Sequence, residues 1–329
     1  MQCLVQLSSV RRSLFATETA RTKFLQQLLG GITAIMRSQS AGLRDLDNYH
    51  EFCRLLARLK TNYQLTELVS VPVYREWVEL IAKFTIESFQ SWQWASNSVY
   101  YLLSLWSRLV ASMPYLRGDT PSLLENYAPQ VMKAWVQSRL ESVTYRLQQG
   151  DEPLDDDEAL SDQLDSVPTL GRCQYETVAA FLVQSLDPLL QQYEGIALMV
   201  AQDDNTRQRL EVLHGQLAWL VYIIGAVVGG RLVSTAGDEH ELLDGELSSR
   251  IFQLMKFMDA RLAQLGAAQC SERLELGLLF FFQQFRKVYI GETALQASRV
   301  YLRLAELLGL SDELAVLNVI VSKMYAFIR

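Results

Sequence analysis

The stretch Val99-Tyr-Tyr-Leu-Leu-Ser-Leu-Trp-Ser-Arg-Leu-Val-Ala-Ser-Met113 indicates the architecture of the chain. Its apolar residues recur at the i, i+3, i+4, i+7 spacing of a helix with one buried face. They are Val99, Leu102, Leu103, Trp106, Leu109, Val110 and Met113. This segment is therefore predicted to be an amphipathic helix packed against neighbours.

The same periodicity recurs on both sides of this segment. It is found in residues 52–63 and 301–308, whereas residues 274–289 are apolar nearly all round and are expected to form a central helix. No sustained strand-like alternation is found, so the chain is predicted to be all-α. Residues that favour helix starts divide it into about a dozen helices. These candidate caps are Thr17, Asp47, Ser96, Thr120, Asp238 with Glu241 three residues on, and Ser311 followed by Asp312 and Glu313.

The spacing of these caps predicts a repeat architecture. A pair of helices takes roughly 40 to 50 residues, which is the unit size of HEAT-type repeats. Such pairs bury their apolar faces only by stacking, so the expected fold is a HEAT-type helical-repeat solenoid, an α-α superhelix. No linker rich in Pro, Gly or Ser divides it. We therefore expect one continuous solenoid, with helical repeats at 1–149 and 171–329 and an acidic loop inserted at 150–170.

That acidic segment contains eight of the 37 acidic residues and no Lys or Arg. Without it, the rest of the chain is close to neutral. Concentrated like charge repels itself, and a partner with a basic surface relieves that repulsion, although a solvated surface loop would have the same composition. The candidate partner-binding residues are Asp151, Glu152, Asp155, Asp156, Asp157, Glu158, Asp162 and Asp165.

Composition limits the compartment and the membrane options. The four cysteines at positions 3, 53, 173 and 270 are far apart and are expected to be reduced. No signal peptide is visible at the N-terminus, which places the chain in the cytosol or nucleus. Residues 212–230 are free of charge, but their densest apolar part, Leu217 to Val228, is shorter than a membrane span, so a buried helix is predicted instead of membrane insertion.

Candidate catalytic, metal-binding and phosphate-binding motifs are each incomplete or fit a structural role better. His50 and Cys53 lie one helical turn apart within an apolar pattern that predicts a packed helix. The cluster Asp238-Glu-His-Glu241 fits a helix cap better than a zinc site, which leaves His240 on the surface. Gly225-Ala-Val-Val-Gly-Gly-Arg231 lacks the Lys and Ser/Thr of a phosphate loop, so its glycines are expected to allow close helix packing. No catalytic residue, cofactor or metal site is predicted, and no nucleic-acid partner is expected.

Several short sequence segments along the chain are nevertheless similar to segments of one protein family. The chain resembles a middle portion of exportin-7 and the related Ran-binding exportins, in the importin-β (karyopherin) superfamily. The phrases that carry the resemblance are Asn48-Tyr-His-Glu-Phe-Cys-Arg-Leu-Leu-Ala-Arg-Leu-Lys60 with Asn62-Tyr-Gln-Leu65, Asn97 to Trp106, Ser138-Arg-Leu-Glu-Ser-Val143, Trp219 to Arg231, Asp244-Gly-Glu-Leu247, Phe285-Arg-Lys-Val-Tyr-Ile-Gly291 and Leu307 to Glu313.

The resemblance implies a HEAT-repeat nuclear transport receptor that acts by binding and not by catalysis. Such a receptor exports protein cargo, shuttles between nucleus and cytoplasm, contacts nuclear pore proteins and is coupled to the GTP form of the small GTPase Ran. It also implies a role for the acidic segment, because several exportins have an acidic loop in a central repeat that contacts Ran or controls cargo release.

Two other functions fit the same residues. A general HEAT-repeat scaffold would bind its partners without regard to nucleotide, and fold alone does not separate it from a receptor. An enzyme that uses a metal ion held by Asp155, Asp156 and Asp157 would require divalent-ion affinity at a segment that lacks the ligand pattern of a calcium loop.

Overall fold

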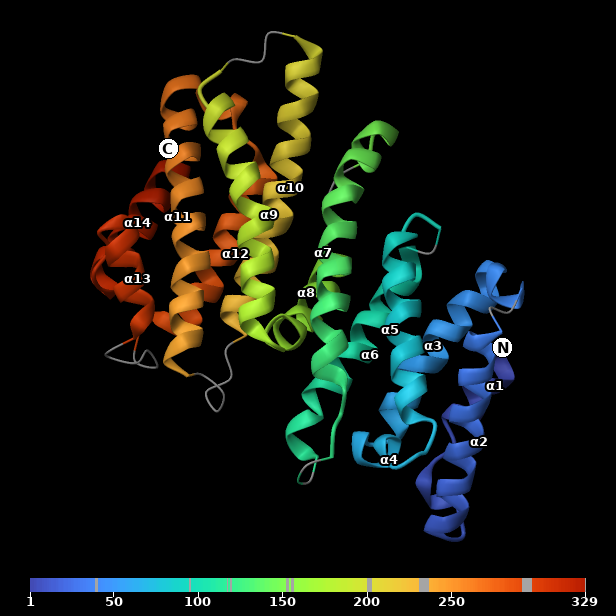
Figure 1. The fold of residues 1–329 in the computed structure, drawn as a ribbon. Coiled ribbons are helices and arrows are strands. Elements are labelled where there is room, and N and C mark those ends of the chain that lie inside the picture. Colours follow the sequence, from blue (N-terminus) through green and yellow to red (C-terminus); the bar gives the residue numbers. More distant parts are fainter. Residues whose placement is uncertain are drawn as a thin grey trace. The chain divides into compact units, whose positions relative to one another are not determined.

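The structure, a computed structural model, describes residues 1–38, 41–94, 96–116, 118, 120–151, 154, 157–199, 203–230, 237–291 and 298–328. Within these ranges every regular element is a helix (Figure 1). The chain forms two compact units, Met1–Ser138 and Arg139–Arg329. The division falls inside the long helix α7, Leu124–Gln149, and not in the acidic segment.

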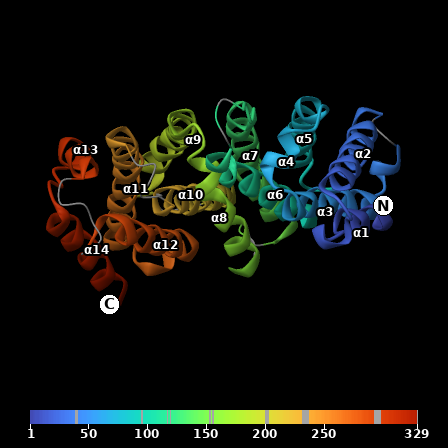
Figure 2. The same ribbon diagram turned by 90° about the horizontal axis from the view of Figure 1, so that it is seen from below.

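The first unit stacks its helices in two layers. Helices α2 and α5 pack together in one layer, and α3 packs against α1 and α6 in the other (Figure 2). Phe52, Leu56, Trp77 and Trp106 are fully buried between them. The helices besides α7 are α1 (Gln2–Ser8), α2 (Glu18–Arg37), α3 (Leu46–Asn62), α4 (Leu65–Val69), α5 (Tyr74–Gln90) and α6 (Val99–Ala111).

The second unit repeats this arrangement. Helix α11 packs between α9 and α13 in one layer, and α10 packs between α8 and α12 in the other (Figure 2). Stacked helix pairs in two layers confirm the predicted all-α, HEAT-type solenoid. The helices are α8 (Asp157–Gly171), α9 (Tyr175–Ile196), α10 (Asp204–Gly229), α11 (Asp238–Leu265), α12 (Glu272–Tyr289), α13 (Arg299–Leu308) and α14 (Glu313–Ile328).

Several predicted caps are displaced by one or two residues. Thr17 caps α2 as predicted, with its Oγ1 3.1 Å from the amide of Ala20. Asp45, and not Asp47, caps α3, and Asp312, and not Ser311, accepts from Ala315 at the start of α14. Asp and Ser both suit a helix start by type, and the backbone of the first turn decides which side chain reaches an amide.

Two further predicted caps are wrong. The N-cap of α11 is Gly237, and Asp238 is the first residue of the helix, so the predicted cap is one residue away from the observed one. Glu241 instead accepts hydrogen bonds from the hydroxyl of Ser298 and the amide of Arg299, at the start of α13. Thr120 precedes α7 by several residues and is not its cap.

The most buried helix of the second unit is α10. It is long and apolar enough to cross a membrane by length and composition, yet 83% of its most apolar window is buried inside the protein. Helix α12, which was expected to be central, has one exposed side that includes Leu276, Gln283 and Lys287. A Cβ added at Gly225 would lie 3.1 Å from the Cα of Phe281, so this glycine lets α12 rest directly on α10.

The acidic segment is not a loop throughout. Helix α8 begins at Asp157, inside the stretch predicted to be irregular, and α9 begins at Tyr175. Leu160, Leu164 and Val167 recur at helical spacing and are buried, and α8 packs on α10. The density of carboxylates hides this apolar stripe in the sequence, because the acidic side chains occupy the opposite side of the same helix.

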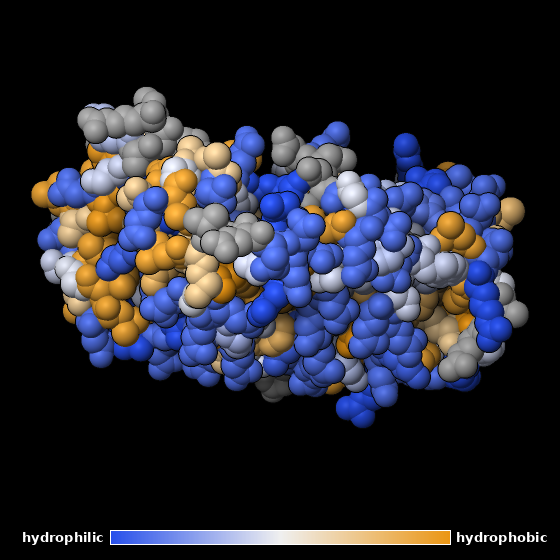
Figure 3. Space-filling view, turned by 90° about the horizontal axis from the view of Figure 1, so that it is seen from above, coloured by the Kyte–Doolittle hydropathy of each residue, from blue (hydrophilic) through white to orange (hydrophobic). Residues whose placement is uncertain are grey.

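Apolar side chains also gather on the surface of the last two helices. Figure 3 shows them at the C-terminal end of the view. Leu302 and Leu314 are each 65% exposed, and Tyr325 is 67% exposed. A neighbouring element would be needed to cover this surface.

Candidate partner-binding surface

Helix α8 presents three carboxylates on one exposed side. Glu158, Asp162 and Asp165 follow one another at intervals of four and three residues, so they form one stripe along the helix. All three are exposed, and within the described part of the chain none of them has an ion-pair or hydrogen-bond partner. Their charges therefore remain available to a cation from outside.

The other predicted acidic residues are only partly placed. Asp151 is exposed directly after Gly150, whose φ of 78° ends α7. Asp157 begins α8, and its side chain lies outside the description. Glu152, Asp155 and Asp156 lie outside the described residues. The structure thus brings together Glu158, Asp162 and Asp165 on one side of α8.

The C-terminal end of α8 is locked to the unit by close packing. A Cβ added at Gly171 would lie 2.6 Å from Cγ2 of Val227, and one added at Gly230 would lie 2.0 Å from Cβ of Pro168. Both contacts need the absence of a side chain, so larger residues would push α8 away from α10. The predicted role of the Gly225–Arg231 stretch in close helix packing is confirmed for its described glycines.

A buried junction follows immediately. Nε of Arg172 donates to the carbonyl oxygen of Val227 at 2.9 Å, and its Nη2 lies 2.9 and 2.8 Å from the two carboxylate oxygens of Asp244. The hydroxyls of Tyr175 and Tyr289 each donate to Asp244 as well. One fully buried carboxylate on α11 therefore ties together the ends of α8, α9, α10 and α12.

The electrostatics of this junction follow from burial and pairing. Burial opposes the charge on Arg172, but the adjacent Asp244 carboxylate outweighs it and raises the arginine pKa. Burial and the same carboxylate raise the pKa of Tyr175, which stays protonated and donates. The junction is a salt bridge whose carboxylate accepts several hydrogen bonds, as a buried charge requires.

The next two residues of α11 connect the junction to a surface pocket. A Cβ added at Gly245 would lie 2.7 Å from Cβ of Arg303, so the glycine lets α13 approach. Glu246 then pairs with Arg250 and with Arg303, each at 2.5 Å. The stretch from Asp244 to Glu246 thus joins α11 to the helices on both sides of it.

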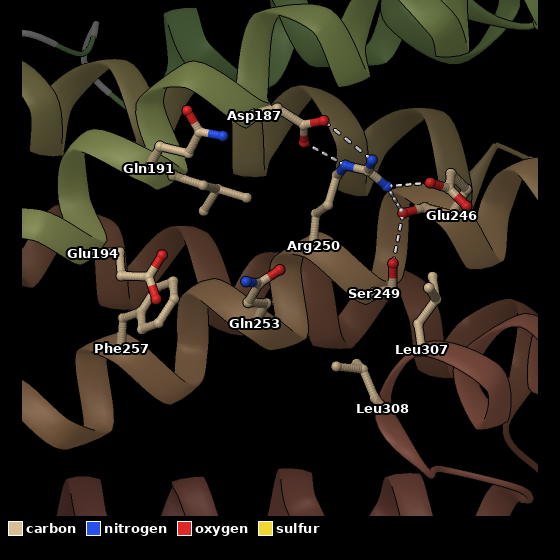
Figure 4. A pocket seen from close by; sticks show the side chains of 11 residues that line it. Asp187, Gln191, Glu194, Glu246, Ser249, Arg250, Gln253, Phe257, Leu307 and Leu308 are labelled. Atoms are coloured by element: carbon tan, nitrogen blue, oxygen red, sulfur yellow. Dashed lines mark hydrogen bonds and ion pairs between the residues drawn. The ribbon is translucent and has the colours of Figure 1, made fainter.

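The pocket lies between α9, α11 and α13 and has a volume of about 310 Å³ (Figure 4). Arg250 lies at its centre, with Nε 2.5 Å from Oδ1 of Asp187 and Nη1 2.5 Å from Oε1 of Glu246. Hydrogen bonds from Arg250 and Arg303 outweigh burial and lower the pKa of Glu246. These carboxylates are neutralised within the protein, so the pocket is held together by its own ion pairs.

The motifs considered for catalysis are part of the packing. Cys53 is fully buried, and burial raises its pKa to about 12, so the thiol is protonated at neutral pH. Nδ1 of His50 lies 3.2 Å from the hydroxyl of Ser98. His240 was expected on the surface but is half-buried with its ring against Tyr175. Among the described residues, no three His, Cys, Asp or Glu side chains converge as metal ligands would.

Sequence reasoning missed the junction around Asp244. Val227, Asp244 and Tyr289 fall in segments that carry the family resemblance, residues 219–231, 244–247 and 285–291, whereas Arg172 and Tyr175 lie outside them. The available signal was an aspartate in a helix whose neighbours are apolar, followed by a glycine. Helical periodicity places such a residue on the buried side, but it does not name Arg172 as its partner.

Comparison with known proteins agrees with this architecture. A family model described as "Exportin-7-like, TPR domain" matches residues 141–329. Exportin-7-B of Xenopus laevis is 49% identical over 325 residues, which cover 98% of this chain and 29% of that relative. Ran-binding protein 17 of Homo sapiens is 46% identical over 98% of the chain and 29% of its own length. Exportin-7 of Dictyostelium discoideum is 36% identical over 98% of the chain and 32% of its own length.

The chain therefore spans about a third or less of the curated relatives that it matches. The family match covers α8, the Asp244 junction and the pocket of Figure 4, and the identities extend through both units. Together with the helical-repeat fold, this similarity shows that the chain belongs to the exportin-7-like family.

Proposed function

We propose that this chain is a segment of an exportin-type nuclear transport receptor. It takes part in the nuclear export of protein cargo coupled to the small GTPase Ran, and it acts by binding and not by catalysis. The receptor shuttles between nucleus and cytoplasm and contacts nuclear pore proteins on the way. Relatives named exportin and Ran-binding protein support the proposal.

The observation that carries the proposal at residue level is the unpaired stripe on α8. Carboxylates that lack an internal cation attract Lys and Arg of a partner, speed its association and make it sensitive to salt. We assign Ran contact to the acidic segment: Asp151, Glu152, Asp155, Asp156, Asp157, Glu158, Asp162 and Asp165.

The test is binding of the chain to Ran loaded with GTP or GDP, at low and at physiological salt. One variant carries Asp155→Asn, Asp156→Asn and Asp157→Asn, and a second carries Glu158→Gln, Asp162→Asn and Asp165→Asn. A control variant, with Glu176→Gln, Glu211→Gln and Glu272→Gln, removes the same number of charges from exposed positions elsewhere in the second unit. Circular dichroism verifies that each variant is folded.

GTP-selective binding that weakens in the two acidic-segment variants, but not in the control, supports Ran recognition by this segment. If neither form of Ran binds a folded chain, or if both bind equally, the Ran assignment is wrong. Partners captured independently of nucleotide would then support the alternative, a HEAT-repeat scaffold without Ran dependence.

A further inference from the structure

A groove lies beside the acidic helix. Residues of α8 and α12 line its two walls, and residues of α10 lie between them. Figure 2 shows that α8 and α12 are both neighbours of α10. Its volume is about 570 Å³, larger than that of the pocket in Figure 4. Leu160 and Leu164 line the α8 wall, Tyr222 lies on the floor, and Leu276 and Phe280 line the α12 wall.

The groove is preformed and held by close packing. A Cβ added at Gly229 would lie 2.7 Å from Cβ of Gln284, and one added at Gly225 would lie 3.1 Å from Phe280, so α10 and α12 cannot slide apart without losing contact. Pro168 against Gly230 fixes α8 in the same way. A groove whose walls are already packed binds a ligand without the cost of ordering those walls.

Its apolar surface remains open to solvent. Leu276 is 46% exposed, and Leu279, Phe280 and Tyr222 are half-buried. Covering this surface would remove apolar area from water at about 25 cal/mol per Å². About half of the exposed lining is apolar and the rest is polar, so the preferred occupant has an apolar side and a polar side, as an amphipathic helix does.

Charge at the edges narrows the choice of occupant. Asp165 lines the α8 wall, and Glu158 and Asp162 continue the same unpaired stripe along that edge. Lys287 lines the opposite edge, on α12. The α8 side has Asp165 in the lining and Glu158 and Asp162 on the same stripe, whereas the α12 side has Lys287 with the exposed Arg286 next to it. This distribution favours an occupant with Lys or Arg on the flank that faces α8.

We propose that this groove docks an amphipathic helix of a partner protein, with its apolar side chains against Tyr222, Leu276 and Phe280 and its basic flank against the α8 carboxylates. The inference deepens the proposed function by naming the chemistry of a cargo segment. It does not require Ran, so the two proposals can fail separately.

The experiment uses fluorescein-labelled 18-residue helical peptides in fluorescence anisotropy, without Ran. Two peptides share leucines at positions i, i+3, i+4 and i+7, and their flanks carry either lysines or glutamates. The lysine peptide is expected to bind more tightly. Leu276→Asp should weaken it at least about tenfold, because a carboxylate enters the apolar wall. Leu302→Asp, at a more exposed leucine on α13, should leave binding unchanged.

Substitutions on the two walls of the groove should change the affinity for the lysine peptide in opposite directions, which is a sharper test. Asp165→Asn should weaken the lysine peptide about two- to fivefold, in the range of an exposed ion pair. Lys287→Gln should tighten it slightly, because a like charge is removed. Glu272→Gln, an exposed acid at the start of α12, serves as the matched control.

Equal binding of the lysine and glutamate peptides would overturn the assignment of the basic flank. Binding that survives Leu276→Asp in a folded variant would overturn the groove itself. Lysine-peptide binding that persists while Ran fails to bind supports this inference and contradicts the Ran assignment, whereas the reverse result contradicts only the groove.

Discussion

Two helices of the same unit use their carboxylates in opposite ways. On α11, Asp244 and Glu246 pair with Arg172, Arg250 and Arg303. On α8, the stripe of Glu158, Asp162 and Asp165 has no partner among the described residues. A carboxylate that is compensated internally stabilises the fold, whereas one left uncompensated on the surface is available to a partner. The number of acidic residues alone does not distinguish these roles.

The largest loss of stability is expected when the buried carboxylate of Asp244 is removed. Asp244→Ala leaves Arg172 buried without a counter-ion and two tyrosine hydroxyls without an acceptor, so the free energy of unfolding should fall by about 3–5 kcal/mol. Urea denaturation followed by circular dichroism measures it. Asp162→Ala, at an exposed position, is the control and should stay within about 0.5 kcal/mol of the parent. Similar values for the two variants would contradict the distinction.

His214 is a buried titratable side chain that has, among the described residues, no anionic partner to stabilise its charged form, so it should make the stability of the fold depend on pH. Burial, with a smaller contribution from the nearby Arg261 charge, lowers the pKa of His214 from 6.5 to about 4. Between pH 6.5 and pH 4, His214 is protonated in the unfolded chain but stays neutral in the folded chain, so stability falls as the pH drops through this range. The loss should be about 2 kcal/mol between pH 7 and pH 5. A His214→Phe variant should lack this part of the pH dependence, and an unchanged pH profile would contradict it.

Removing the central arginine of the pocket in Figure 4 should reduce stability by a smaller amount. Arg250→Ala removes the cation shared by Asp187 and Glu246, which are only partly buried, and should cost about 1–2 kcal/mol of unfolding free energy. A double-mutant cycle with Asp187→Ala, measured by urea denaturation, isolates their coupling. If the two single effects simply add, the ion pair contributes nothing and the pocket is held by packing alone.

The smallest effect on stability is expected on α8. Replacing Glu158, Asp162 and Asp165 with their amides should change the free energy of unfolding by no more than about 0.5 kcal/mol, because these side chains have no partner to lose. The same variant should bind basic partners less tightly, and its binding should depend less on salt. A large loss of stability would show that these three carboxylates stabilise the fold, as Asp244 does, and would contradict their assignment as unpaired surface charges.

The sequence determined the class of fold and the location of the charge. Helical periodicity at residues 99–113 predicted α6, and the glycines near residue 225 predicted the close approach of α10 to another helix, because apolar spacing and the absence of a side chain are local properties. The excess of acid at 151–165 was equally visible. Helix boundaries such as that of α8 were less certain, because the acidic side chains mask the apolar stripe beneath them.

Only the tertiary structure decided which charges are compensated. Asp244 and Arg172 are 72 residues apart, and Arg250 and Asp187 are 63 apart, so no local pattern joins them. The groove beside α8 likewise needs walls from α8 and α12, with α10 between them. Pairing and concavity depend on the packing of distant helices, and packing is a property of the assembled chain, not of any segment within it.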